Sequence, residues 1–354
     1  MSHTKEIMND AFLKVSKFEF KNPEYFNKFL KNNSSGFKKY ILRFFYFYFL
    51  RYRIFRNYIS PFFQKNRFGL IKEINLNPER FDKIYEILHD SLSKETFDWY
   101  IKNRIAQATL DNLSINVFPS SIKENDFITL ENSLKEVKKG VYEIENYNVR
   151  GDKFGLICTF MINQYKYYDI IKPEKDDIVI DGGGYVGDTA LWFSKHIGED
   201  GKVFCFEPFD SNFAVLMENI KNNNIKNIIP EQFGLWGNKT ILKINGTSSG
   251  AFIDKTGFNI HVVSIDEFVK NNKLQKINFI KLDIEGAELN ALEGAKETIK
   301  KFKPKLAICV YHKKKDIIEI PEYIMRLVPE YKIMLKSNSF NFLETVMYAS
   351  ILNK

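Results

Sequence analysis

Cysteine is scarce in this chain, which has only three in 354 residues. The number is odd, and Cys158, Cys205 and Cys309 are scattered among apolar, strand-like runs. This pattern predicts buried free thiols. The chain also has no C-x-x-C pair and no histidine-rich tract, so the usual signatures of a structural zinc site are missing.

Sequence signals for export and for membrane insertion are lacking as well. The first ten residues, MSHTKEIMND, are polar and contain no signal-peptide core. The apolar run Phe44–Leu50 is seven residues long, whereas a membrane-spanning helix needs about 20. From these absences we expect a cytoplasmic protein.

Acidic residues are absent from residues 25–72, which hold 11 basic and 17 aromatic residues. Three interpretations of the centre of this segment, residues 38–63, stay open. The first is a helix buried against the rest of the chain or in a homo-oligomer. The second is a peripheral helix at the inner face of the membrane, where acidic lipid headgroups attract basic side chains. The third, nucleic-acid binding, is disfavoured because no recognisable nucleic-acid module accompanies the charge.

The pattern of apolar residues changes near residue 150. Residues 1–145 show helical periodicity, which predicts a mainly helical N-terminal region. Residues 150–354 alternate between strand-like and helical segments, which predicts an α/β domain with a parallel sheet and helices on both faces. The last two apolar runs are joined by a short turn and must pair antiparallel. Strands are expected at 178–181, 203–207, 227–233, 277–283 and 305–311, followed by the pair 331–336 and 342–350.

A glycine-rich turn follows the first of these strands, in IVIDGGGYVGDTALWF (178–193). A strand, a tight glycine turn and a helix start form the layout in which doubly wound sheets bind nucleotide-like ligands. The next strand ends at Glu207, where an acidic side chain accepts both hydroxyls of a ribose. NAD and S-adenosylmethionine (SAM) both remain open. Asp181 at the strand end favours SAM, because a carboxylate repels a pyrophosphate and attracts an ammonium or a sulfonium.

Further polar side chains fall at the carboxyl ends of later strands, the edge at which an open sheet of this kind binds ligands. Asp283 and Glu285 come at and after the end of INFIKLD, and His312 follows KLAICVY. If consecutive strands are neighbours, Asp283 and His312 lie side by side and face the ligand crevice.

A longer match is carried by INFIKLDIEGAELNALEGAKETIKKFKPKLAICVYHK (277–313), which closely resembles the FkbM family of SAM-dependent methyltransferases. The same family is matched by IDGGGYVGDTA, by the FEP triplet (206–208), by VVSIDEFV (262–269) and by ETVMYA (344–349). The resemblance covers about 150–350, with a weaker match at 84–105. Residues 1–75 lie outside it.

The resemblance implies a class I methyltransferase fold, which is Rossmann-like and doubly wound, with a seven-stranded sheet whose last strand is antiparallel. It also implies methyl transfer from SAM to a hydroxyl of a sugar, a glycan precursor or a similar small molecule. His312 is the candidate general base, oriented by Asp283. Glu207 is expected at the ribose, and Phe233 and Gly234 beside the adenine. The remaining residues expected to bind SAM are Asp181, Gly182, Gly183, Gly184, Gly187 and Asp188.

Three acids, Asp283, Glu285 and Glu288, raise the question of Mg²⁺, which some sugar methyltransferases use to acidify the acceptor. Glu285 and Glu288 lie at a helix start, where unpaired amides favour acids regardless of function. We therefore expect no metal ligands. Two other functions stay open. One is an NAD(P)-dependent oxidoreductase or sugar epimerase that uses the same glycine turn, and the other is a non-catalytic protein that assembles through its N-terminal segment.

Overall fold

The computed structural model describes residues 2–21, 69–110, 113–245, 252–253 and 257–352. The chain divides into two compact units. One is Met1–Glu86 with Glu95–Ser120, and the other is Ile87–Lys94 with Ser121–Lys354. No helix of the described part of the chain is long and apolar enough to cross a membrane. The segment 38–63, with its predicted subunit or membrane contact, lies outside the described residues.

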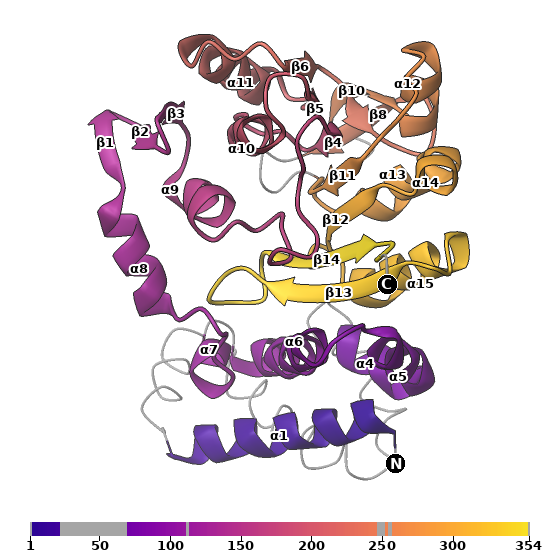
Figure 1. Cartoon of the computed structure of the whole chain (residues 1–354). Coiled ribbons are helices and arrows are strands. Elements are labelled where there is room, and N and C mark those ends of the chain that lie inside the picture. The colour runs from indigo at the N-terminus through magenta and orange to yellow at the C-terminus, as the bar shows by residue number, and fades with distance from the viewer. Residues whose placement is uncertain (1, 22–68, 111–112, 246–251, 254–256, 353–354) are drawn as a thin grey trace. The chain divides into compact units, whose positions relative to one another are not determined.

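The first unit is helical, as the sequence predicts. Hydrogen bonds from the backbone amide and the hydroxyl of Thr4 to Asp82 Oδ1 (2.9 and 2.6 Å) connect its first helix to a later one. A second link is the ion pair between Asp10 and Lys102, at 3.1 Å. The helices are α1 (His3–Lys21), α4 (Gly69–Leu76), α5 (Pro78–Ile87), α6 (Ser91–Leu110) and α7 (Ser114–Val117) (Figure 1).

The second unit is built on a seven-stranded sheet of order β13-β14-β12-β11-β4-β5-β6. The five strands from β12 to β6 in this order are parallel, whereas β14 runs antiparallel to both of its neighbours. The predicted antiparallel C-terminal pair is therefore confirmed. The strands are β4 (Ile178–Gly182), β5 (Lys202–Phe206), β6 (Ile228–Glu231), β11 (Phe279–Leu282), β12 (Lys305–Cys309), β13 (Lys332–Ser337) and β14 (Thr345–Ser350).

The strand order reverses between β4 and β11. From β4 the chain runs outward through β5 and β6 and then crosses back to β11 and β12 on the other side. Such a reversal opens a crevice at the carboxyl ends of the two strands, where doubly wound sheets bind their ligands. The glycine turn leaves β4 at this point, and Asp283 follows β11.

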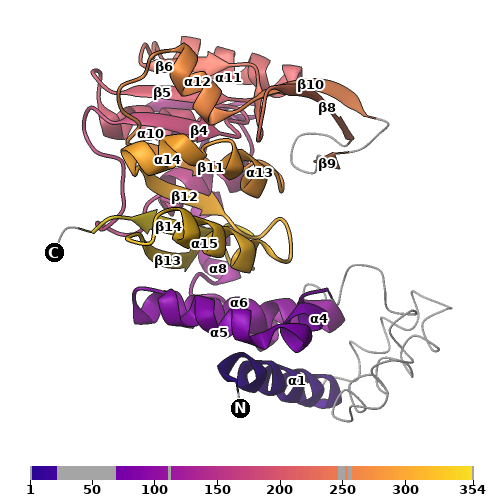
Figure 2. The same cartoon turned by 90° about the vertical axis from the view of Figure 1, so that its right-hand side faces the viewer.

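Helices cover both faces of this sheet (Figures 1 and 2). On one face α10 turns three large apolar side chains inward, Leu191, Trp192 and Phe193, all with no exposed surface. This burial explains why the sequence after the glycine turn is apolar almost all round. The helices are α10 (Asp188–Ile197) and α11 (Asp210–Asn222) on that face, and α12 (Ile265–Asn271), α13 (Glu288–Glu293), α14 (Lys296–Phe302) and α15 (Asp316–Leu327) on the other.

A smaller four-stranded sheet, of order β7-β10-β8-β9, is inserted between β6 and α12. Its two long strands, β8 and β10, pair antiparallel and project from the edge of the unit (Figure 2). The sequence analysis did not predict this sheet. The strands are β7 (Gly234–Leu235), β8 (Thr240–Asn245), β9 (Phe252–Ile253) and β10 (Phe258–Val263).

Residues 121–150 belong to the sheet-containing unit, whereas the sequence placed the boundary near residue 145. They form α8 (Glu124–Ser133) and three antiparallel strands, β1 (Lys135–Lys138), β2 (Val141–Ile144) and β3 (Tyr147–Arg150). These strands are too short to give a clear alternating pattern. They are followed by α9 (Lys153–Leu156) and by one π-helical turn, Ile157–Met161.

The side chain of Asn219 on α11 joins these strands to the glycine turn. Its amide oxygen accepts from Arg150 N at 2.9 Å, and its Nδ2 donates to the carbonyls of Arg150 (2.9 Å) and Val186 (2.8 Å). Asn219 is fully buried. Three backbone groups therefore depend on one side chain.

We expect Asn219→Ala to lower the free energy of unfolding by about 1–3 kcal/mol, because buried backbone groups lose their partners. Chemical denaturation measures this loss, and Lys221→Ala on the exposed face of the same helix is the matched control. An Asn219→Ala protein as stable as that control would show that the three hydrogen bonds contribute little.

Candidate active site

The glycine turn between β4 and α10 requires glycine at defined positions. Gly183 and Gly187 have φ angles of 80° and 89°, a region that favours residues without a side chain. A Cβ on Gly183 would lie 1.9 Å from the carbonyl oxygen of Asp283, and one on Gly184 would lie 2.1 Å from Cys205 Sγ. The turn therefore runs directly against β5 and against the residue that follows β11.

Asp181 is fully buried and already has partners. Lys281 Nζ lies 3.0 Å from its Oδ1, and the Thr189 hydroxyl donates to its Oδ2 at 2.7 Å. Lys281 has no exposed surface, and burial lowers its pKa, but the negative charges of Asp181 and Asp283 outweigh that effect and raise it. Lys281 therefore keeps its positive charge beside Asp181. This charge offsets the repulsion of a pyrophosphate that we expected from Asp181 alone, so Asp181 by itself does not separate SAM from NAD.

Lys281 is the residue at this site that the sequence analysis did not single out. Besides Asp181 it donates to the carbonyls of Gly182 and Gly183, at 3.0 and 2.7 Å. It thereby determines the course of the first two residues of the glycine turn. A signal was present in the sequence, since a lysine inside the apolar run INFIKL has to find a buried carboxylate.

Glu207 lies just past the end of β5 with its carboxylate against the glycine turn. It accepts from the amides of Tyr185 (2.9 Å) and Phe209 (3.0 Å), and from Asn212 Nδ2 at 3.3 Å. Burial raises the pKa of Glu207 to about 7, against the lowering effect of these hydrogen bonds. The predicted position of Glu207 at the end of β5 is thus found, and its role at a ribose stays a prediction.

Asp188 occupies the first position of α10, the place where a dinucleotide fold binds pyrophosphate. It is buried and accepts from the Thr159 hydroxyl at 3.0 Å. Burial, and after it the negative charge of Asp152, raises the pKa of Asp188 to about 6. A Cβ on Gly155 would lie 3.3 Å from a carboxylate oxygen of Asp152 and 3.5 Å from one of Asp188. Acidic groups therefore surround the start of this helix.

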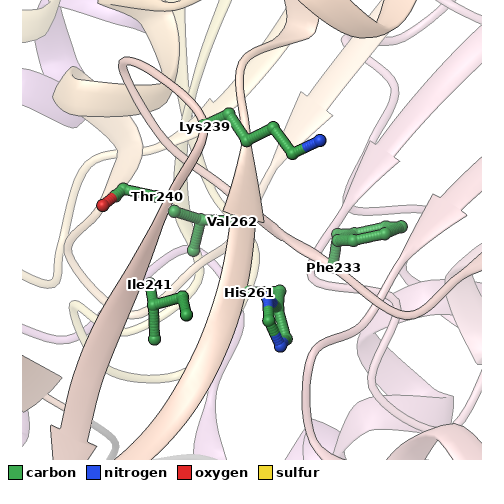
Figure 3. Close-up of a pocket in the computed structure, with 6 residues that line it drawn as sticks. All are labelled: Phe233, Lys239, Thr240, Ile241, His261 and Val262. Atoms are coloured by element: carbon green, nitrogen blue, oxygen red, sulfur yellow. The ribbon is translucent and has the colours of Figure 1, made fainter.

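Phe233, predicted to flank the adenine, lines a cavity of about 460 Å³ beside the small inserted sheet (Figure 3). In the close-up its ring and that of His261 both border the hollow. Gly234 is buried, and a Cβ there would lie 3.0 Å from Val262 and 3.8 Å from Pro208, which follows Glu207. The other residues that line the cavity are Lys239, Thr240, Ile241 and Val262.

Asp283 and His312 lie together, as the sequence predicts. His312 Nε2 is 3.5 Å from Asp283 Oδ1 and 3.6 Å from Glu285 Oε2, and its Nδ1 is 2.9 Å from Glu288 Oε1. Burial lowers the pKa of His312, but the three carboxylates outweigh that effect and raise it to about 10. A protonated imidazole cannot accept a proton. In this arrangement His312 therefore does not have the form that a general base requires.

Asp283 connects this cluster to a buried network of hydroxyls. Tyr165 donates to its Oδ2 at 2.9 Å, and the Tyr311 hydroxyl lies 3.2 Å from its Oδ1 and 3.2 Å from Glu344 Oε1. Burial raises the pKa of Asp283, but the charges of His312 and Lys281 and the Tyr165 hydrogen bond hold it below its ordinary value. Asp283 is thus an ionised acceptor.

Residues 181–342 match the family model of the methyltransferase FkbM domain. These residues, and not the whole chain, are assigned to the FkbM methyltransferase domain. The match begins at Asp181, includes the glycine turn, Glu207, Lys281, Asp283 and His312, and ends before β14. The resemblance seen in the sequence is therefore confirmed.

Known proteins similar to this chain carry methyltransferase names. "Methyltransferase 1" of Beauveria bassiana is 24% identical over 36% of this chain and 62% of its own length. "Hexuronic acid methyltransferase AglP" of Haloferax volcanii is 27% identical over 48% of this chain and 69% of its own length. A crystal structure of methyltransferase FkbM from Methylobacillus flagellatus KT matches the fold, with a TM-score of 0.55 and 20% identity, over 78% of this chain and 60% of that one. The chain thus spans roughly three fifths to two thirds of these relatives.

We expect Lys281→Met to lower the free energy of unfolding by about 3–5 kcal/mol, because it leaves the Asp181 carboxylate buried without its counter-charge. Asp181→Leu should act in the same direction. The double variant should lose much less than the sum, since no unpaired charge remains. Denaturation of the four proteins gives the coupling energy, and Lys270→Met on the exposed face of α12 is the control. Additive losses would contradict the ion pair.

Proposed function

We propose that the FkbM domain transfers a methyl group from SAM to a hydroxyl of a sugar or glycan precursor. The observation that carries the choice of cofactor is the position of Asp188 at the first residue of α10, with Asp152 beside it. This helix start offers negative charge, which attracts an ammonium or sulfonium and repels a pyrophosphate. The choice of acceptor is supported by the similarity to a hexuronic acid methyltransferase.

The residues of the glycine turn fit SAM. The glycines at 183 and 187, where the backbone is left-handed, place no side chain at these two positions, so that a ligand can approach the main chain there. We assign the amino-acid end to the turn and Asp188, with Asp181 acting through its pair with Lys281. The ribose is assigned to Glu207, and the adenine to Phe233 and Gly234. When bound, SAM supplies an electrophilic methyl group on sulfur.

The acceptor is assigned to the cluster of His312 and Asp283 at the ends of β12 and β11. The close approach of Gly183 to the Asp283 carbonyl brings this cluster next to the cofactor turn. Holding the hydroxyl in line with the methyl group converts a bimolecular encounter into an effectively unimolecular step, which accounts for a large part of the expected acceleration. The side chains of Asp283 and His312 are 22% and 10% exposed, so the cluster is largely shielded from water.

Cofactor binding should be linked to the ionisation of Glu207. Ribose hydroxyls that donate to this carboxylate favour its charged form and lower its pKa from about 7. SAM affinity should then be highest above pH 7 and should fall by up to about tenfold per pH unit below it. Near pH 6 binding should release a proton, which calorimetry in buffers of different protonation enthalpy detects.

The matched variant is Glu207→Gln, which keeps the size of the side chain and removes its titration. It should bind SAM more weakly by about 1–3 kcal/mol. The pH dependence that remains in the variant belongs to other groups, so the difference between the two proteins isolates Glu207. Equal affinity and equal proton release would remove Glu207 from the ribose site. Tighter binding of NAD than of SAM, with a substrate-dependent absorbance change at 340 nm, would replace the proposed activity by that of an oxidoreductase.

His312→Ala should keep SAM affinity within a few-fold and lower kcat by about two orders of magnitude or more, because the residue acts on the acceptor. The assay is transfer of a labelled methyl group to glycans that contain uronic acid. His196→Ala, on the sheet-facing helix α10, is the control for general loss of a histidine. An unchanged kcat in His312→Ala would show that residues other than His312 act on the acceptor.

A further inference from the structure

We propose that Asp283, Glu288 and His312 bind one divalent cation of the Mn²⁺ and Mg²⁺ class. One ligand atom from each of these residues lies within 4.8 Å of the others. The inference rests on the proposed function for its catalytic role but not for cation binding itself. It gives His312 the role of a ligand in place of a general base.

The sequence around Asp283 folds so that Glu288 is brought back to it. Glu285 and Gly286 both have left-handed backbone, with φ of 55° and 92°. The chain therefore reverses between β11 and α13, and Glu288 Oε1 accepts from the amides of Ile284 (2.9 Å) and Gly286 (3.2 Å). Both amides lie in the turn that precedes α13, and they account for one of the two carboxylate oxygens.

The second oxygen of Glu288 is the observation that points to a ligand. Glu288 has no exposed surface, and its Oε2 has no hydrogen-bond partner among the described residues. A buried carboxylate oxygen without a donor is unfavourable, because it has lost its water and gained nothing in exchange. His312 Nδ1 likewise lacks a well-aligned hydrogen bond, although it lies 2.9 Å from Glu288 Oε1. A cation satisfies both groups.

The charges around the cluster also favour a cation. The carboxylates of Asp283, Glu285 and Glu288 surround a single imidazole. Lys281, two residues before Asp283 in the chain, is ion-paired with Asp181 at 3.0 Å, although its charge also acts on Asp283. Negative groups therefore outnumber positive ones at this point of the site, and a divalent ion would restore the balance.

The donor set decides the class of metal. Two carboxylates and one imidazole, with no thiolate, suit oxygen-preferring ions, and the imidazole favours Mn²⁺ over Mg²⁺ and Ca²⁺. Three protein ligands leave positions open in an octahedral shell for water and for the acceptor hydroxyl. Coordination lowers the pKa of that hydroxyl and makes it a better nucleophile at neutral pH.

Glu285 completes the arrangement. It stands outside the ligand group, and its side chain is 35% exposed and 3.6 Å from His312 Nε2. We assign it to proton removal. The hydroxyl proton passes to the Glu285 carboxylate, the new oxygen–carbon bond forms, and the carbon–sulfur bond breaks with its electron pair left on sulfur. Atoms and charges balance without a further reagent.

The test measures Mn²⁺ binding to the full-length, metal-free protein without SAM or acceptor. Binding is detected as a decrease in the electron paramagnetic resonance signal of free Mn²⁺. We expect one site per chain. Glu288→Gln keeps an oxygen for the two amides and should weaken binding at least tenfold, as should His312→Ala. Glu293→Gln, exposed on the same helix, should bind as the unaltered protein does. Retained SAM affinity in each variant shows that it has folded.

Measurements of methyl transfer distinguish the cation site from the proposed methyltransferase activity. Glu285→Gln should bind Mn²⁺ within a few-fold of normal but lower kcat at least tenfold. Methyl transfer that survives EDTA, or Mn²⁺ binding that survives both Glu288→Gln and His312→Ala, would overturn the cation site while leaving the methyltransferase intact. Stoichiometric Mn²⁺ binding lost in those two variants, in a protein that binds no SAM, would leave the cation site and overturn the proposed function.

Discussion

Lys281 and Asp181 face each other across the pairing of β11 with β4, in register and without contact with water. Removing two charges from water is costly, and the cost is offset only when the geometry of the pair and its hydrogen bonds is good. Lys281 meets this condition by also binding the carbonyls of Gly182 and Gly183. The pairing of Lys281 with Asp181 therefore holds the two central strands in register and also positions the glycine turn. A displacement of either strand would leave a buried charge unpaired.

Besides this ion pair, the site contains two different electrostatic environments. On the cofactor side, Glu207 and Asp188 are buried acids with pKa values raised to about 7 and 6, so their charge depends on what binds. On the acceptor side, Asp283 remains ionised because His312 and Lys281 oppose the effect of burial. The proposed cationic cofactor and the proposed acceptor hydroxyl would thus meet different electrostatics, and the sheet places the two environments at adjacent strand ends.

Much of the fold follows from the sequence, since apolar runs that alternate with helical segments predict the strands of the main sheet, and the acids after these runs are found at the carboxyl ends of the strands. Residue spacing alone does not identify the partner of Asp181. In the sequence Lys281 is one polar residue in an apolar strand, and only the register of β11 against β4 shows that it faces Asp181. The inserted strands β7–β10 were not predicted because two of them have only two residues each. The raised pKa of His312 depends on the carboxylates of Asp283, Glu285 and Glu288, and their convergence on a single imidazole appears only in three dimensions.

The contact between Gly183 and the Asp283 carbonyl has a consequence for how such an enzyme can change. A Cβ at Gly183 would stand 1.9 Å from that oxygen, well inside van der Waals contact, so no other residue fits there without moving the start of the turn that carries Glu285 and Glu288. The glycine turn and the turn after β11 are therefore sterically coupled, so that neither can shift without the other. Substitutions that alter ligand preference without disturbing this contact are therefore expected at positions away from these two turns.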